Sequence, residues 1–168
     1  GLPSSVPFVG PETQEREAKR KFFSRLGANE NVFGPSPKVL KSIQKDMSDI
    51  WKYSDPESYD LRLAIAKKEN VKIENVVIGE GIDGLLGYLC RLLVSPGVSV
   101  VTSKGAYPTF NYHVSGFGGT LHLVPYRNDY EDLEQLTSMA KKTQASLIYL
   151  ANPDNPMGTF HSKQVIED

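Results

Sequence analysis

The chain has 168 residues, enough for one domain with a packed core, and its 19 basic and 20 acidic residues give a formal net charge of −1. This balance argues against a dedicated nucleic-acid binder, which would usually be basic. No apolar run approaches the roughly 18 residues of a membrane span, and the first residues lack the charged and apolar regions of a signal peptide. We therefore expect a cytoplasmic protein that binds neither nucleic acid nor a membrane.

Residues 1 to about 26 are predicted to form an N-terminal arm, because three prolines and two glycines in the first eleven positions favour irregular chain. The charged run from Glu12 to Arg25 predicts either a short helix or a solvated tail. A helix should follow in which Ser36 is the N-cap and Pro37 takes the first helical position. Its apolar residues recur at helical spacing and predict a core-facing side: Val39, Leu40, Ile43 and Met47.

A second helix is expected from a cap at Ser58 through about Asn70, with three residues pointing inward: Leu61, Ala64 and Ile65. Short β-prone runs then follow at Val76–Ile78, Val98–Thr102, Thr120–Val124 and Ser146–Leu150. Helical-length segments lie between them at Ile82–Val94, Tyr107 to about Phe117, and Tyr130–Thr143. Alternation of strands and helices predicts a three-layer α/β/α fold with a mostly parallel sheet.

The first candidate binding loop is Gly79-Glu80-Gly81-Ile82-Asp83-Gly84, between the first predicted strand and its helix. A glycine turn lets backbone N–H groups approach a phosphate, and the helix N-terminus adds positive potential. Glycines are also common at such turns for purely structural reasons, and Asp83 could simply cap the helix. A dinucleotide site is disfavoured, because the next strand does not end in an acidic residue.

Two further loops follow predicted strands, and each displays a residue suited to a flat ligand. Tyr107 comes after the second strand, where its ring could stack on a heteroaromatic ring or could belong to the core. Asn155 lies in Asn152-Pro153-Asp154-Asn155-Pro156-Met157-Gly158, after the last strand, where its amide could donate to a phenolate oxygen. Open α/β sheets bind ligands at this edge, outside the carboxyl ends of the strands.

The cysteine and the histidines of this sequence do not form a pattern that predicts a metal site. Cys90, the single cysteine, lies among leucines and is predicted to be a buried small hydrophobe. The three histidines, His113, His122 and His161, do not have the spacing of metal ligands. We therefore expect no metal site.

The stretch 152–158 resembles the Asn-Pro-x-Asn-Pro-Thr-Gly signature of fold-type I aminotransferases that use pyridoxal 5'-phosphate (PLP), above all the histidinol-phosphate aminotransferases. Met157 replaces the threonine of that signature. The resemblance implies an N-terminal arm and small-domain segment over residues 1–48. It also implies an incomplete PLP-binding large domain over residues 49–168.

The same resemblance assigns roles to the loop residues. The amides of Gly81, Ile82 and Asp83 would hold the cofactor phosphate, as in the family's Gly-x-Gly-x-Asp-Glu, although Gly84 replaces the glutamate. Tyr107 would cover the pyridine ring, and Asn155 would bind the ring oxygen.

Three residues of the N-terminal part also have family counterparts. Tyr53 in Trp51–Glu57 matches a tyrosine that reaches the cofactor phosphate of the other subunit in a homodimer, although a plain surface tyrosine is the alternative. Asn29 could line the substrate site or bond its own backbone. Phe8 falls where histidinol-phosphate enzymes have a tyrosine that contacts the substrate phosphate, which argues mildly against histidinol phosphate as substrate.

The resemblance implies transfer of an amino group between an amino acid, histidinol-phosphate-like or aromatic, and a 2-oxo acid. The family's Schiff-base lysine lies downstream of the Asn-Pro-x-Asn-Pro motif, so we expect this chain alone to be inactive and to be a fragment. A PLP-dependent decarboxylase of phosphorylated amino acids shares these motifs. A non-catalytic α/β module that binds a phosphorylated ligand would explain the missing lysine without truncation.

Overall fold

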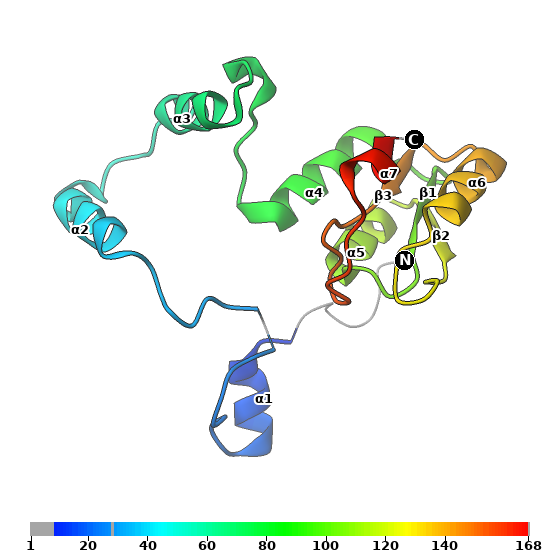
Figure 1. Cartoon of the computed structure of the whole chain (residues 1–168). Coiled ribbons are helices and arrows are strands. Elements are labelled where there is room, and N and C mark those ends of the chain that lie inside the picture. Colours follow the sequence, from blue (N-terminus) through cyan, green and yellow to red (C-terminus); the bar gives the residue numbers. More distant parts are fainter. Residues whose placement is uncertain (1–8, 28, 168) are drawn as a thin grey trace. The chain divides into compact units, whose positions relative to one another are not determined.

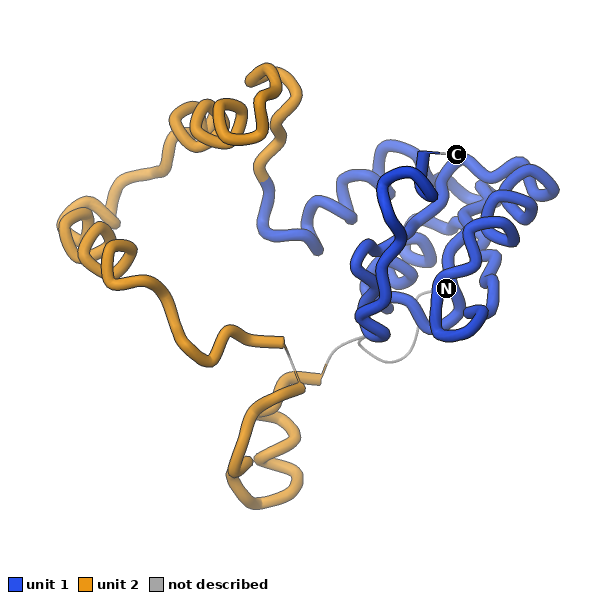
Figure 2. Tube along the Cα trace, viewed as in Figure 1, with its two compact units in different colours: residues 1–8, 79–168 blue, residues 9–78 orange. Residues whose placement is uncertain are grey.

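The computed structural model describes residues 9–27 and 29–167 of the chain. These residues form two compact units, Val9–Ile78 and a second unit that begins at Gly79 (Figure 2). The predicted division after residue 48 concerns the domains of a longer protein and stays a prediction. Among the described residues, no helix combines the length and the apolar character needed to cross a membrane.

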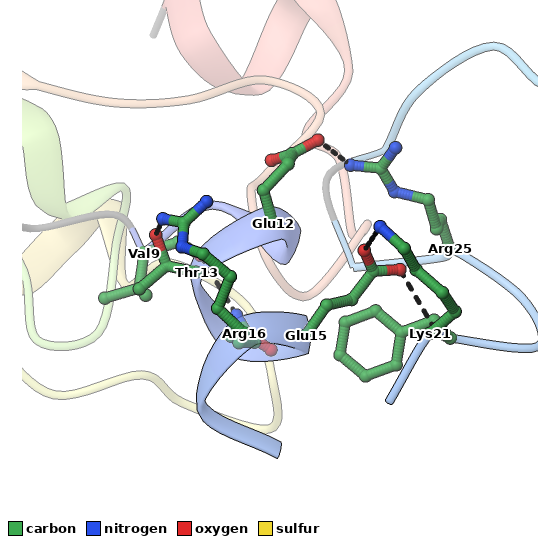
Figure 3. A network of polar contacts seen from close by, with 9 residues as sticks. Val9, Glu12, Thr13, Glu15, Arg16, Lys21 and Arg25 are labelled. Atoms are coloured by element: carbon green, nitrogen blue, oxygen red, sulfur yellow. Dashed lines mark hydrogen bonds and ion pairs between the residues drawn. The ribbon is translucent and has the colours of Figure 1, made fainter. Parts of the chain in front are cut away.

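The unit Val9–Ile78 begins with helix α1 (Pro11–Ala18), which confirms a short helix in the charged N-terminal run. Acidic side chains of α1 hold the chain that follows it (Figure 3). Glu12 pairs with Arg25, and Glu15 accepts hydrogen bonds from the Lys21 side chain at 2.9 Å and from the Phe22 backbone N–H at 3.0 Å. These polar contacts fold the segment back along α1.

Helix α2 (Pro37–Asp46) starts as predicted, with Ser36 Oγ accepting a hydrogen bond from Val39 N–H at 3.3 Å. A 3₁₀ turn, η1 (Met47–Asp49), extends it. The predicted core-facing side is wrong for this chain, since its four apolar residues are about half exposed: Val39, Leu40, Ile43 and Met47. Periodicity identified an apolar face, but no other described residues cover it.

Helix α3 (Tyr59–Glu69) confirms the second predicted helix, and the 3₁₀ turn η2 (Ile73–Asn75) follows it. The predicted inward face is wrong for Leu61 and Ala64, which are exposed, whereas Ile65 is partly buried and the fully buried residue is Ala66. The strand expected at Val76–Ile78 does not form. The carbonyl of Val76 accepts from the Arg62 guanidinium at 2.9 Å instead of from a neighbouring strand.

The second unit is built on a parallel sheet of three strands, β1 (Ser99–Ser103), β2 (Thr120–Val124) and β3 (Leu147–Tyr149) (Figure 1). Their order is β2-β1-β3, so β1 is central. Val100 of β1 lies opposite Leu121 and Leu147. These strands fall within one residue or so of three of the predicted ones.

Helices cover both faces of this sheet, which confirms the predicted three-layer α/β/α class. Helices α4 (Gly81–Leu93) and α5 (Pro108–Gly116) pack on one face, and α6 (Leu133–Thr143) packs on the other. The first cluster contains Leu86, Cys90, Val94, Val100, Phe110 and Val114, and the second contains Val101, Val124 and Leu136. Successive residues of β1, Val100 and Val101, serve opposite faces, as the two-residue period of a strand requires.

Helix α6 begins later than predicted, and one more short helix follows the last strand. Helix α6 starts at Leu133 rather than Tyr130, because the Asp132 side chain caps it by accepting from Gln135 N–H at 3.1 Å. Helix α7 (Lys163–Glu167) is a short segment after the loop that follows β3.

Helices α4 and α5 run in the same direction relative to the sheet. The loop after α4 leads into β1, the loop after α5 leads into β2, and the two loops are joined by the bond from Gly97 N–H to the Gly118 carbonyl at 3.0 Å. Both helices therefore end at the edge where the strands begin. Their N-termini accordingly point toward the carboxyl ends of the strands, where ligand sites of open α/β sheets lie.

Candidate functional site

The first turn of α4 is the candidate phosphate site. Gly81 has φ = 72°, a conformation that favours glycine, and its N–H donates to the Gly79 carbonyl at 2.8 Å. No side chain caps this helix, so the amides of Ile82 and Asp83 are left for a ligand or water. A Cβ atom added at Gly81 would meet nothing within 4 Å, so the space above the turn is open. This donor set suits an anion.

A carboxylate that sequence reasoning did not single out lies beside this turn. Glu80 accepts from the Tyr88 hydroxyl at 2.9 Å, and its Oε2 lies 2.9 Å from where a Cβ of residue 84 would be. Its own backbone N–H and the Tyr88 hydroxyl lower the pKa of Glu80. Glu80 therefore takes the space that Gly84 leaves free.

Asp83 does not cap α4 but bonds to α5. Its Oδ1 lies 2.8 Å from Nε2 of His113. Gly87 leaves room for that ring, since a Cβ atom there would be 3.1 Å from His113 Cε1. The contact ties the start of α4 to α5. It could not be predicted from the sequence, because residues 30 positions apart meet only through the packing of two helices.

Tyr107 occupies the N-cap position of α5, at the end of the short loop that follows β1. It is half-buried and packs against the first core cluster. Phe110 and Tyr149 of that cluster stack with ring centroids 4.3 Å apart. Part of Tyr107 thus contributes to the core while part stays accessible, and its role over a ligand ring stays a prediction.

The loop after β3 has a defined hydrogen-bonded shape. Asp154 N–H donates to the Thr159 carbonyl at 2.8 Å, and Gly158 N–H donates to the Asp154 carbonyl at 2.9 Å. The amide of Asn152 donates to the His161 carbonyl at 3.0 Å and accepts from the His161 N–H at 2.9 Å. The peptide bonds before Pro153 and Pro156 are cis.

Asn155 stands out in this loop because its side chain is exposed and makes none of the hydrogen bonds recorded among the described residues. Its neighbour Asp154 is 6% exposed. Oδ2 of Asp154 accepts from Met157 N–H at 2.9 Å, and Oδ1 accepts from the Tyr126 hydroxyl at 3.0 Å. The buried Asp154 therefore fixes the turn, while Asn155 keeps its donor available to a ligand.

Sequence reasoning missed a buried acid behind this loop. Glu131 is 2% exposed and precedes the N-cap of α6. It accepts from Ser103 Oγ at 2.5 Å and from Ala151 N–H at 3.1 Å. Ser103 ends β1 and Ala151 follows β3, so Glu131 connects the carboxyl ends of two neighbouring strands.

The remaining candidates lie in the other unit or outside the described residues. Tyr53 is fully exposed. Asn29 is exposed and has φ = 54°, a left-handed conformation that asparagine tolerates. Both roles stay predictions, and Phe8 lies outside the described residues.

The residues of the second unit fit the chemistry of PLP. The uncapped turn at Gly81 provides donors for a phosphate, Tyr107 provides an aromatic face, and Asn155 provides an amide donor. Tyr107 and Asn155 lie in the loops that follow β1 and β3, and the N-terminus of α4 points toward the same edge of the sheet, where open α/β sheets bind ligands. Two acidic side chains lie at the phosphate turn, and both have partners: Glu80 accepts from the Tyr88 hydroxyl, and Asp83 contacts His113.

Comparison with known proteins agrees with this reading. The sequence profile of the family "Aminotransferase class I and II" matches residues 23–168. A histidinol-phosphate aminotransferase from Staphylococcus epidermidis is 32% identical over 163 residues, 96% of this chain and 46% of the relative. The crystal structure of histidinol-phosphate aminotransferase from Sinorhizobium meliloti in complex with PLP superposes with a TM-score of 0.92 and 54% identity, over 96% of this chain and 44% of that one.

A more distant structure supports the fold alone. A putative histidinol-phosphate aminotransferase from Erwinia carotovora atroseptica has a TM-score of 0.80 at 23% identity, over 85% of this chain and 42% of that one. The chain spans under half the length of the relatives it matches. From the extent of the family match, the chain belongs to the class I and II aminotransferases.

Proposed function

We propose that the protein to which this chain belongs is a PLP-dependent aminotransferase. It transfers an amino group between an amino acid, histidinol-phosphate-like or aromatic, and a 2-oxo acid. The proposal rests on three groups of the second unit that suit the parts of PLP: the uncapped turn at Gly81, the partly accessible ring of Tyr107 and the exposed amide of Asn155. Family membership and the PLP-bound relative support it.

Each of these residues has a distinct task. The amides of Ile82 and Asp83 and the glycine turn at Gly81 bind the phosphate, with the α4 dipole adding positive potential. Tyr107 lies against one face of the ring, held by its contact with the core cluster. Asn155 donates to the ring oxygen and stabilises its ionised form.

When bound, PLP supplies an electron sink for bonds at the α-carbon of the amino acid. The residues of this chain orient the cofactor and set its charge distribution. The bond between His113 and Asp83 holds the start of α4 against α5, so the phosphate turn keeps its position relative to Tyr107. The buried Asp154 does the same for Asn155.

The proposal extends to assembly and location. Full exposure of Tyr53 in the single chain is what a residue serving a neighbouring subunit of a homodimer requires. Asn29, in a left-handed turn, is proposed to line the substrate site. We also propose a cytoplasmic location.

The test is the change Asn155→Ala in the full-length protein reconstituted with PLP. Loss of one charge-assisted hydrogen bond, about 1.5–3 kcal/mol, should weaken PLP binding roughly ten- to a hundredfold. It should also shift the absorption band of the bound cofactor, because the ring oxygen loses its donor. Absorbance titration with PLP measures both effects.

Met157→Ala is the matched control, since Met157 is exposed in the same loop but carries no amide. It should leave the band in place. An unchanged band and affinity in Asn155→Ala would remove the ring-oxygen role. Absence of any PLP binding in the full-length protein would overturn the proposed function itself.

A further inference from the structure

Glu131 lies where two parallel strands of the second unit stop pairing. The register of β1 and β3 ends with Thr102 opposite Tyr149. Beyond that step the Glu131 carboxylate links the two strands, because Ser103 Oγ donates to its Oε2 and Ala151 N–H donates to its Oε1 at 3.1 Å. A side chain, rather than a further backbone pair, therefore connects the carboxyl ends of β1 and β3.

The β1 side of this link is fixed in the interior. Glu131 is 2% exposed and Ser103 is 0% exposed. Ser103 also takes part in the pairing of β1 with β2, where it lies opposite Val124. A buried carboxylate without donors is costly, so the two hydrogen bonds restrict the Glu131 side chain to one position. Ser103 is thus a fixed point in the central strand, and Glu131 attaches the chain after β3 to it.

The segment that carries Glu131 also holds the chain at two later places. His161 Nε2 lies 2.9 Å from the Glu131 carbonyl oxygen, and because a carbonyl can only accept, the ring donates. The Thr159 hydroxyl donates to the Asp129 carbonyl at 2.9 Å. Together with the bond to the residue that precedes the loop, these contacts hold the chain at both ends of the Asn152–Gly158 loop.

Asn155 depends on such links for its position. Its exposed side chain makes none of the hydrogen bonds recorded among the described residues, so its place follows from the backbone of the loop. The bond from Asp154 N–H to the Thr159 carbonyl fixes the shape of the loop but not its place on the sheet. Bonds to other elements fix that place, and Tyr126 provides one through Asp154 while Glu131 provides the one at the start of the loop.

Each strand end that Glu131 joins leads into a loop with a candidate cofactor group. Tyr107 follows β1, and Asn155 follows β3. We propose that Glu131 is a positioning residue that fixes the Asn152–Gly158 loop relative to β1, and so sets the place of Asn155 relative to Tyr107. The ordering of the loop stands without a cofactor, while the effect on PLP through Asn155 rests on the proposed function.

The first test measures amide hydrogen exchange in the full-length protein without PLP, by mass spectrometry of peptides that cover residues 147–158. Glu131→Met keeps the length of the side chain but removes both acceptors, so exchange in these peptides should accelerate. Glu131→Gln keeps an acceptor for Ala151 N–H and can donate to the Ser103 hydroxyl, so exchange should stay close to that of the unmodified protein. Unchanged exchange in Glu131→Met would overturn the proposal.

A milder variant and a matched control accompany this test. Ser103→Ala removes one donor without adding bulk, and it should accelerate the same exchange to a smaller extent even if Glu131→Met does not fold. Glu134→Met makes the same substitution at a side chain that is 82% exposed near the same helix end, and it should leave the exchange unchanged. No acceleration in Ser103→Ala, or equal acceleration in Glu134→Met and Glu131→Met, would overturn the proposal.

The second test asks whether Glu131 acts on the cofactor through Asn155. Glu131→Met should weaken PLP binding by about three- to tenfold and shift the absorption band in the same direction as Asn155→Ala, because the amide donor is displaced. Glu131→Gln should restore both. In the double variant, Glu131→Met should add no more than about twofold to the effect of Asn155→Ala, since its effect passes through that residue. Full addition of the two effects would overturn the role through Asn155.

The two measurements separate this proposal from the proposed function. Hydrogen exchange needs no cofactor, so accelerated exchange in Glu131→Met of a protein that does not bind PLP would overturn the proposed function and support the ordering of the loop by Glu131. Normal PLP binding in the unmodified protein, with unchanged exchange and an unchanged absorption band in Glu131→Met, would overturn the positioning role alone.

Discussion

The two units of this chain contain comparable amphipathic patterns but bury them very differently. In the unit that begins at Gly79, both faces of β1 are fully covered, as the 0% exposure of Val100 and Val101 shows. In the unit Val9–Ile78, Ile43 of α2 is 56% exposed and Trp51 is 78% exposed. The difference is the sheet. A parallel strand offers two faces to neighbouring helices, whereas an isolated helix without a partner has nothing to pack against.

An apolar stripe on a helix shows that burying that face would be favourable. Whether the face is buried depends on whether another element packs against it. Within the described residues, α4, α5 and α6 pack on the sheet, whereas the main contacts of α2 are with the 3₁₀ turn η1 that continues it. Substitutions of equal chemistry should therefore have unequal consequences in the two units.

The largest contrast is expected from truncating a core aromatic. Phe110 is 1% exposed and stacks on Tyr149, so Phe110→Ala should destabilise the protein by about 3–5 kcal/mol. Ile43→Ala in α2 should change the free energy of unfolding by about 0.5 kcal/mol or less, as surface changes do. Urea unfolding followed by far-ultraviolet circular dichroism measures both. Similar losses at the two positions would mean that the α2 face is covered in the protein in solution.

A smaller contrast is expected from adding one methyl group. A Cβ at Gly119 would lie 2.6 Å from Val94 Cγ1 and 2.8 Å from Val114 Cγ1, so Gly119→Ala should cost about 1–3 kcal/mol through overpacking. At Gly27 a Cβ would meet nothing within 4 Å, and Gly27→Ala should be close to neutral. The thermal midpoint of each variant decides the matter. A neutral Gly119→Ala would indicate that the first core cluster repacks freely.

The smallest effect concerns the acidic groups, which respond to pH with opposite signs in the two units. Hydrogen bonds from Lys21 and then from Phe22 N–H lower the pKa of Glu15, whereas burial raises that of Glu131. The contribution of Glu15 is present above its ordinary pKa and is lost as pH falls through its lowered folded value. The Phe22 amide shift, followed by nuclear magnetic resonance, should therefore titrate below the ordinary range for glutamate. Glu15→Gln removes that step, and a step in the ordinary range would contradict the contact.

Much of the secondary structure in both units could be predicted from the sequence. Runs of β-prone residues fixed three strands to within about a residue, and Ser36 fixed the start of α2 through its side-chain oxygen. These features depend on neighbours in the chain, on period-two patterns and on caps, so they are legible without a structure. The Asn152–Gly158 motif likewise predicted a turn after a strand, and the structure shows Asn155 exposed in that turn.

Other features depended on contacts between distant residues. The stretch Val76–Ile78 has the composition of a strand, but its backbone is satisfied by Arg62 rather than by a ladder. The partnership of His113 with Asp83 needed α4 and α5 to pack together, and Gly87 to leave space for the ring. Such contacts between distant residues cannot be predicted from a single sequence.

Local patterns and turn chemistry were enough to predict the fold class, the family and the loops that could hold a phosphate, a ring and a ring oxygen, because these features depend on residues close together in the chain. Which apolar faces are covered, and which acids are buried, depends on contacts between distant segments and became known from the structure. Glu131 and Asp154 are 23 positions apart and look like ordinary surface acids in the sequence. Glu131 accepts from Ser103 at the end of β1 and from Ala151 after β3, and it can reach both because these strands are neighbours in a parallel sheet.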